Sequence, residues 1–234
     1  MKPALVDVSV LILFFNRPQQ LSQVFEQVKK ARPSRLFLYQ DGARNEHDLP
    51  GIKACREIVS QIDWECEVER FYQEKNFGCD PSEYISQKWA FSKVDKCIVL
   101  EDDDVPSVSF FRFCKEMLDK YEHDTRISMI AGFNPEEISK DIPYDYFFAT
   151  TFSIWGWASW KTCRRPMGRV LYFSGRLLQY AATRTTHQRT QVPERLHLYV
   201  PASSRTPEGF LRNHFPCLHT VQLRTEHCAH TQHD

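Results

Sequence analysis

The sequence Lys96-Cys97-Ile98-Val99-Leu100-Glu101-Asp102-Asp103-Asp104 joins a short apolar run directly to four carboxylates. The apolar run predicts a buried strand with the acidic side chains at its C-terminal end. If the chain stays extended, Glu101 and Asp103 share one face and Asp102 and Asp104 the other. Clustered acids repel one another, and an uncompensated buried charge is costly. We therefore expect either a bound cation or bulk water among them.

A hard cation such as Mg²⁺ or Mn²⁺ is the functional interpretation of this cluster. Both ions prefer carboxylate oxygens and keep coordination positions open for phosphate. Ligands of α/β sheets bind at the carboxyl ends of the strands. The alternative is a solvated acidic turn, which is the commoner origin of acidic runs. The position directly after a buried strand favours the metal.

Composition limits the other classes of function. The chain has 234 residues, enough for one large α/β domain, and thirty basic side chains balance thirty acidic ones. No global charge therefore indicates nucleic acid or an anionic membrane as a partner. The N-terminal residues lack a signal-peptide pattern, and the apolar run 10–15 is far shorter than the roughly 20 residues that span a bilayer. Eight cysteines without a Cys-x-x-Cys pair indicate reduced thiols, so we expect a cytoplasmic protein.

Hydrophobic periodicity predicts strands and helices in alternation over the first 131 residues. We expect strands at 8–14, 35–39, 65–72, 96–100 and 127–131, the third of them half-exposed near a sheet edge. We expect helices after Pro18, at about 50–61, from a cap at Asp80 or Ser82 to near Lys93, and over 110–121. This order predicts an α/β fold with a mainly parallel sheet covered by helices.

Residues 166–234 differ from the rest of the chain. They contain no Lys and no Ile, whereas residues 1–165 hold all twelve Lys, and seven of the nine His lie in this segment. Apolar periodicity is weak there. A disordered basic arm or a separate small module is one interpretation. A reading-frame change in the coding DNA near Arg164-Arg165 is another, and we expect that the segment does not belong to the fold encoded upstream.

The same segment contains a group of potential zinc ligands: Cys217, His219, His227, Cys228, His230 and His233. Their spacing does not match the paired Cys-x₂₋₄-Cys and His-x₃₋₅-His pattern of structural zinc sites. We do not predict a zinc site.

Four short motifs of the first 165 residues resemble the GT-A nucleotide-sugar glycosyltransferases. They are Phe15-Asn16-Arg17-Pro18, Asp41-Gly42, Asn76-Phe77-Gly78 and the acidic stretch ending in Asp104. Residues 99–111 followed by Trp155-Gly156-Trp157 are similar to the bacterial HlpA-like transferases and, more remotely, to N-acetylglucosaminyltransferases with a Glu-Asp-Asp metal motif. The resemblance covers about two thirds of the chain. It implies a Rossmann-like GT-A fold, with helices on both faces of a mainly parallel central sheet.

The resemblance also implies roles for individual residues. The donor, expected to be a uridine diphosphate sugar, would be bound by Phe14, Asn16, Arg17, Asp41, Asn76, Gly78, Glu101 and Asp102. The metal, Mn²⁺ or Mg²⁺, would be held by Asp103 above all, with Asp102 and Asp104 beside it. Trp155, Gly156 and Trp157 would form part of the acceptor or sugar wall, with Trp157 outside the deep core.

The implied reaction is inverting transfer of a sugar to a saccharide acceptor. A divalent cation offsets the charge of the departing nucleoside diphosphate, and a carboxylate base accepts the proton of the acceptor hydroxyl. The family carries that base after the Trp-Gly-Trp segment. Between Asp145 and Glu208 this sequence has only Glu194, so no catalytic base can be named.

Two rival functions are compatible with parts of the sequence. Asp102-Asp103-Asp104-Val105 satisfies the Asp-x-Asp-x-Val pattern of haloacid-dehalogenase phosphatases, but those enzymes carry it on the first strand. The other rival is a catalytically impaired nucleotide-sugar-binding protein that has lost its general base. Donor hydrolysis or transfer, as opposed to binding alone, separates this rival from the enzyme.

Overall fold

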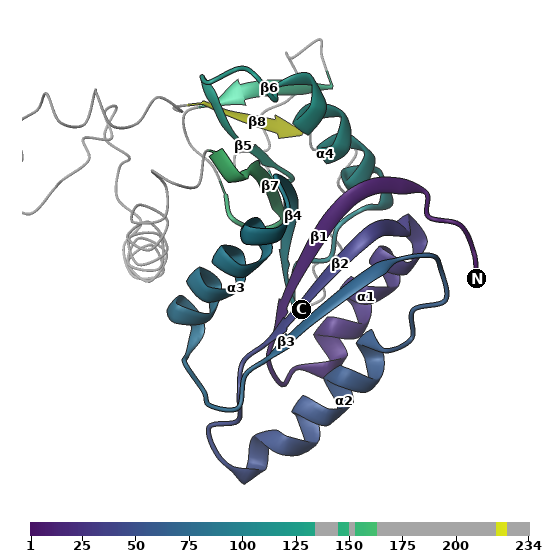
Figure 1. The fold of residues 1–234 in the computed structure, drawn as a ribbon, viewed down its shortest axis with the longest axis vertical. Helices are drawn as coiled ribbons and strands as arrows, with labels where there is room; N and C mark the ends of the chain where they lie inside the picture. Colours follow the sequence, from purple (N-terminus) through teal and green to yellow (C-terminus); the bar gives the residue numbers. More distant parts are fainter. Residues whose placement is uncertain (134–144, 150–152, 163–218, 224–234) are drawn as a thin grey trace, which may run out of the picture. The chain divides into compact units, whose positions relative to one another are not determined.

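The computed structural model describes residues 1–133, 145–149, 153–162 and 219–223. All of them belong to one compact unit, formed by Met1–Arg164 together with Cys217–Asp234. Strands and helices alternate through the first 131 residues as predicted (Figure 1). The elements in chain order are β1 (Val6–Phe14), α1 (Pro18–Ala31), β2 (Pro33–Gln40), the short 3-10 helix η1 (Glu46–Asp48), α2 (Leu49–Val59), β3 (Glu67–Tyr72), α3 (Cys79–Lys93), β4 (Lys96–Glu101), α4 (Val108–Lys120), β5 (Ile127–Ala131), β6 (Tyr146–Ala149), β7 (Trp157–Trp160) and β8 (His219–Leu223).

The described strands form one mixed sheet in the order β3-β2-β1-β4-β7-β5-β8-β6. The half made of β3, β2, β1 and β4 is entirely parallel. In the other half β7 runs antiparallel to both β4 and β5, and β8 is parallel to β5 but antiparallel to β6. Because parallel neighbours need a crossover, the β-α-β units of the first half carry their helices across the faces of the sheet.

Helices cover both faces of this sheet, which confirms the predicted fold class. α1 packs against α2 and α4, whereas α3 packs against β1 and β4 and lies on the other side in Figure 1. The first helix shows why the sequence folds this way, because Leu21, Val24, Phe25 and Val28 form one apolar stripe and all four are buried. No helix in the described part of the chain combines the length and the apolar character needed to cross a membrane.

The fold places three parallel strands with their carboxyl ends side by side. The register pairs Phe14 of β1 with Gln40 of β2, and Leu13 of β1 with Glu101 of β4. The residues that follow each strand therefore meet at one edge of the sheet, which is where α/β folds bind their ligands.

Three local predictions need correction. The faces do not alternate through Asp104, because β4 ends at Glu101 and the next residues form a turn. Helix α3 is not capped by Asp80 or Ser82, because it begins at Cys79 after Gly78, whose φ of 84° favours glycine. Five residues after position 165 do join the sheet, as β8, whereas the other residues of 166–234 lie outside the described part of the chain.

Candidate functional site: a pocket at the carboxyl ends of β1, β2 and β4

A pocket of about 270 Å³ opens where these three strands end. Residues from the ends of the strands and from the first turn of α3 surround it. They are Leu13, Phe14, Phe15, Arg17, Tyr39, Asp41, Arg44, Asn76, Gly78, Cys79, Ser82, Glu83, Glu101 and Asp102. Seven of the predicted donor-binding positions are among them, so the fold brings together motifs that lie far apart in the sequence.

Asp41 organises the wall made by the turn 76–78. Its carboxylate accepts hydrogen bonds from the backbone amides of Phe77 and Gly78, both at 2.9 Å, and from the side-chain amide of Asn76. Only 6% of Asp41 is exposed. The resemblance implied that Asp41 touches the base or ribose, and in this structure its carboxylate shapes the turn beside the pocket.

Gly42 makes that turn possible by close packing. A Cβ at this position would lie 2.5 Å from the backbone carbon of Lys75, a distance that side chains do not tolerate. Backbone cannot move aside as a flexible side chain can, so the Asp41-Gly42 motif is needed for the approach of the segment 75–78.

Arg17 joins two of the predicted metal ligands. Its Nη1 donates to Asp103 at 2.9 Å, and its Nη2 forms a short ion pair with the buried Asp102. The other oxygen of Asp102 accepts the backbone amide of Phe15 at 3.3 Å. Burial works against the charged guanidinium, but its bonds to the two carboxylates raise the pKa of Arg17.

Asp104 faces a different set of partners. Its Oδ2 accepts the backbone amides of Glu101 and of Gly156, both at 3.0 Å. These bonds close the turn after β4 and tie it to the segment that leads into β7. The carboxylate of Asp104 is thus a structural acceptor between two loops.

The three carboxylates do not fit the predicted divalent cation. Arg17 occupies Asp102 and Asp103, while Asp104 turns toward backbone amides elsewhere. Across the described ranges, no group of three His, Cys, Asp or Glu side chains is arranged to hold a metal ion. The physical reason is that the strand ends at Glu101, so the carboxylates diverge around a turn.

Two glutamates that line the pocket have pKa values above the ordinary value of a glutamate. Burial raises the pKa of Glu101 to about 8, and repulsion from Asp104 and Glu83 adds to the effect. Burial likewise raises the pKa of Glu83. A carboxyl group that keeps its proton near neutral pH can donate a hydrogen bond to a ligand.

Some pocket residues were not found from the sequence. Arg44 lies over the ring of Phe15, with its Cζ 5.0 Å from the ring centre, and donates to Asp48. Its hydrogen bonds lower the pKa of Asp48 to about 2. Tyr39, Ser82 and Glu83 reach the pocket only through the packing of β2 and α3. For Arg44 the sequence held one signal, because this basic residue stands two positions after the Asp41-Gly42 motif.

Other predicted site residues lie apart from the pocket. Asn16 donates to Asp48 at 2.6 Å and does not line the pocket. Phe14 does line it, with 4% of its surface exposed. The roles given to these residues in donor binding stay predictions.

The Trp155-Gly156-Trp157 segment divides between surface and core. Trp155 is 54% exposed and its ring centre lies 4.7 Å from that of Phe133. Trp157 is 3% exposed, which corrects the expectation that it lies outside the deep core. It is buried because β7 inserts between β4 and β5. Within this segment, Trp155 is the indole whose side chain is exposed to solvent.

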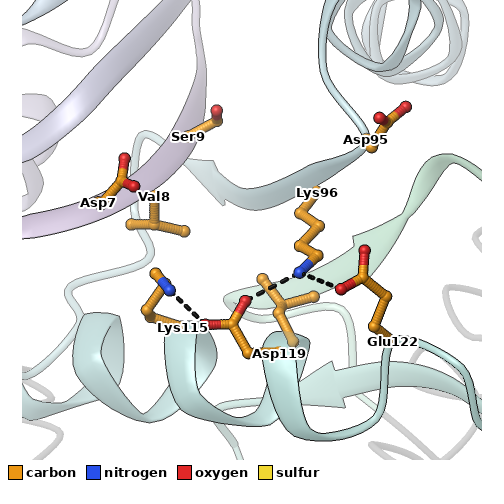
Figure 2. Close-up of a pocket in the computed structure, with 9 residues that line it drawn as sticks. Asp7, Val8, Ser9, Asp95, Lys96, Lys115, Asp119 and Glu122 are labelled. Carbon is orange, nitrogen blue, oxygen red and sulfur yellow. Dashed lines mark hydrogen bonds and ion pairs between the residues drawn. The ribbon is translucent and has the colours of Figure 1, made fainter.

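A second pocket, of about 330 Å³, lies at the opposite ends of the strands (Figure 2). It lies beside Asp7 and Ser9 at the start of β1 and Lys96 at the start of β4. Its two lysines are already paired, because Lys96 donates to Asp119 at 2.8 Å and to Glu122 at 2.9 Å, and Lys115 also binds Asp119. A parallel sheet binds ligands at its carboxyl ends, so the first pocket is the candidate site.

The order of strands and crossovers defines a Rossmann-like α/β fold, with the pocket at the carboxyl ends of its parallel strands. No family model matches the sequence, and no curated protein matches it. Among solved structures, the chain is similar to 4-diphosphocytidyl-2C-methyl-D-erythritol synthase from Anaerococcus prevotii DSM 20548. The TM-score is 0.42 at 10% identity, over 70% of this chain and 75% of that one. The fold assignment itself rests on the strand order and the crossovers.

Proposed function

We propose that this protein is a glycosyltransferase that takes its sugar from a nucleoside-diphosphate donor, expected to be a uridine diphosphate sugar, and transfers it to a saccharide. The observation that carries the proposal is the convergence of four separate motifs on one pocket. Arg17, Asp41 and Asn76 come from three of them and Glu101 and Asp102 from the fourth, and all line the same 270 Å³ space. Each motif is one that resembles the nucleotide-sugar transferases.

The chemistry of the pocket suits such a donor. The half-buried Phe15 supplies apolar surface for a base, and the polar rim supplies partners for a ribose or sugar. Arg17 and Arg44 place two guanidinium groups at the pocket, and guanidinium groups bind phosphate through paired hydrogen bonds. Stabilising the departing diphosphate is the main electrostatic requirement of the reaction. In this proposal the positive charge near the diphosphate comes from Arg17 and Arg44 and not from the predicted Mn²⁺ or Mg²⁺, because Arg17 already pairs with Asp102 and Asp103.

A second candidate function is nucleotide-sugar binding without transfer. One observation favours it: in the described residues after Ala131, Asp145 is the only carboxylate, and it is exposed. An inverting transferase needs a base on the acceptor side of the donor. A protein with the donor pocket and no base would bind the nucleotide sugar and release it unchanged.

Calorimetry with a panel of nucleoside diphosphates tests the proposal first. We expect one of them to bind the parent protein and to bind Arg44→Ala about tenfold more weakly, through loss of one guanidinium contact. Arg126→Ala is the matched control, because Arg126 pairs with Asp124 on the surface and does not line the pocket.

Incubation of the matching nucleotide sugar with saccharides then separates the two candidates. Release of the nucleoside diphosphate together with a new glycoside supports the transferase. Binding without turnover supports the second candidate. If no nucleoside diphosphate binds the parent protein, both are wrong.

A further inference from the structure

The guanidinium of Arg17 lies where the sequence predicted a divalent cation. It bridges Asp102 and Asp103, with one terminal nitrogen on each carboxylate. The side chain of Asp102 is almost fully buried, at 4% exposure, whereas those of Arg17 and Asp103 are 45% and 50% exposed. One positive group therefore serves two carboxylates at the mouth of the donor pocket.

A divalent cation cannot use these carboxylates while Arg17 holds them. A metal bound to Asp102 and Asp103 would need oxygen ligands at about 2.1 Å, inside the space that the guanidinium occupies. Both oxygens of Asp102 already accept hydrogen bonds, Oδ1 from Arg17 and Oδ2 from the backbone amide of Phe15. Asp104 is engaged elsewhere, since its Oδ2 accepts the backbone amides of Glu101 and Gly156.

We infer that Arg17 is the built-in counter-ion of the acidic cluster, and that the pocket binds the diphosphate of its donor without a divalent cation. The second half of this inference rests on the proposed function. Arg17 lies three residues after the end of β1 and immediately before the first residue of α1, so two regular elements position its backbone.

The same side chain is suited to the phosphates. A guanidinium has five N–H donors, more than its bonds to two carboxylates use, and it remains partly exposed. Arginine also keeps its charge at every pH at which proteins are folded. Arg17 therefore offers the phosphates N–H donors that do not depend on metal supply, while Asp102 and Asp103 offset its charge.

Titration of the protein with Mn²⁺ alone tests the counter-ion role, by calorimetry or by the electron paramagnetic resonance of free Mn²⁺. We expect the parent to show no site tighter than millimolar, and Arg17→Ala to gain at least about tenfold in Mn²⁺ affinity by releasing two carboxylates. Arg126→Ala should behave as the parent. A micromolar Mn²⁺ site in the parent, lost in Asp103→Ala, would overturn the inference.

Because Arg17→Ala leaves the buried Asp102 without its partner, the second measurement uses the parent protein and the charge-preserving variant Arg17→Lys. We expect uridine diphosphate to bind equally well in excess EDTA and in Mn²⁺, and Arg17→Lys to bind it about tenfold more weakly in both, since lysine lacks the planar fork. Binding that requires Mn²⁺ would overturn the inference and leave the proposed function standing. If no nucleoside diphosphate binds in either buffer but the Mn²⁺ titration gives the expected result, the proposed function fails and the counter-ion role stands.

Discussion

The side-chain amide of Asn76 donates a 2.9 Å hydrogen bond to the carboxylate of Asp41, and a second one of the same length to the carbonyl of Gly42. The two motifs that resemble donor-binding segments thus bind each other. The backbone amides of Phe77 and Gly78 complete the contact. This connection fixes the turn before α3 against the end of β2, and with it one wall of the pocket.

Replacing Asp41 should therefore destabilise the fold as well as the pocket. Asp41→Ala leaves buried donors of the turn without an acceptor, and we expect the free energy of unfolding to fall by about 3 kcal/mol. Urea denaturation followed by circular dichroism measures this. Asp63→Ala, which removes an exposed ion pair with Lys2, should cost less than about 1 kcal/mol. Equal losses in the two variants would contradict the role assigned to Asp41.

The two indoles of the Trp-Gly-Trp segment should respond differently to truncation. Trp157→Ala empties a buried position in β7, and we expect a loss of about 3–5 kcal/mol. Trp155→Ala removes an exposed ring whose partner is Phe133, so its cost should be about 1 kcal/mol. Thermal and chemical unfolding of both variants checks the order. A larger loss for Trp155→Ala than for Trp157→Ala would mean that Trp155, and not Trp157, is the buried indole.

Stability should fall as pH rises through the neutral range. Folding raises the pKa of Glu101 from its ordinary value of 4.5 to about 8, mainly through burial, so the folded protein holds the proton more tightly than the unfolded chain. Between these two values the folded state binds more protons, and the free energy of unfolding decreases with pH by up to about 1.4 kcal/mol per unit. Burial also raises the pKa of Asp104, to about 7, which acts in the same direction.

Glu101→Gln should weaken this dependence, because the amide cannot titrate. Denaturation at a series of pH values between about 4.5 and about 8 should give a shallower slope for the variant than for the parent. Glu57→Gln, on the exposed face of α2, should keep the slope of the parent. A parent protein that becomes more stable as pH rises through this window would show that Glu101 is charged in the folded state.

The compositional break after residue 165 leads to a prediction about the coding DNA. A frame change near Arg164-Arg165 would explain together the loss of Lys and Ile and the missing carboxylate base. Translation of the downstream DNA in the other two frames should then reveal a segment with Lys, Ile and an acidic residue in ordinary proportions. If both frames meet stop codons soon after this point, the segment is the natural continuation of the chain, as the pairing of β8 with β5 and β6 would suggest.

The order of elements and the edge of the sheet that carries the site could be predicted from the sequence. The reason is periodicity: the apolar run ending at Leu100 and the stripe Leu21, Val24, Phe25, Val28 reflect which faces are buried, and burial follows from local pattern. Short motifs such as Asp41-Gly42 identified the ends of the strands for the same reason, since turns need particular residues.

Only the tertiary structure decided what each polar side chain does at that edge. Which partner a carboxylate meets depends on where its strand stops and which loop packs against it. Because β4 ends at Glu101, Asp102 turns to Arg17 and Asp104 to the amide of Gly156, partners distant in sequence that no local pattern specifies. The insertion of β7 between β4 and β5 likewise buries Trp157, because strand order is a non-local property of the chain.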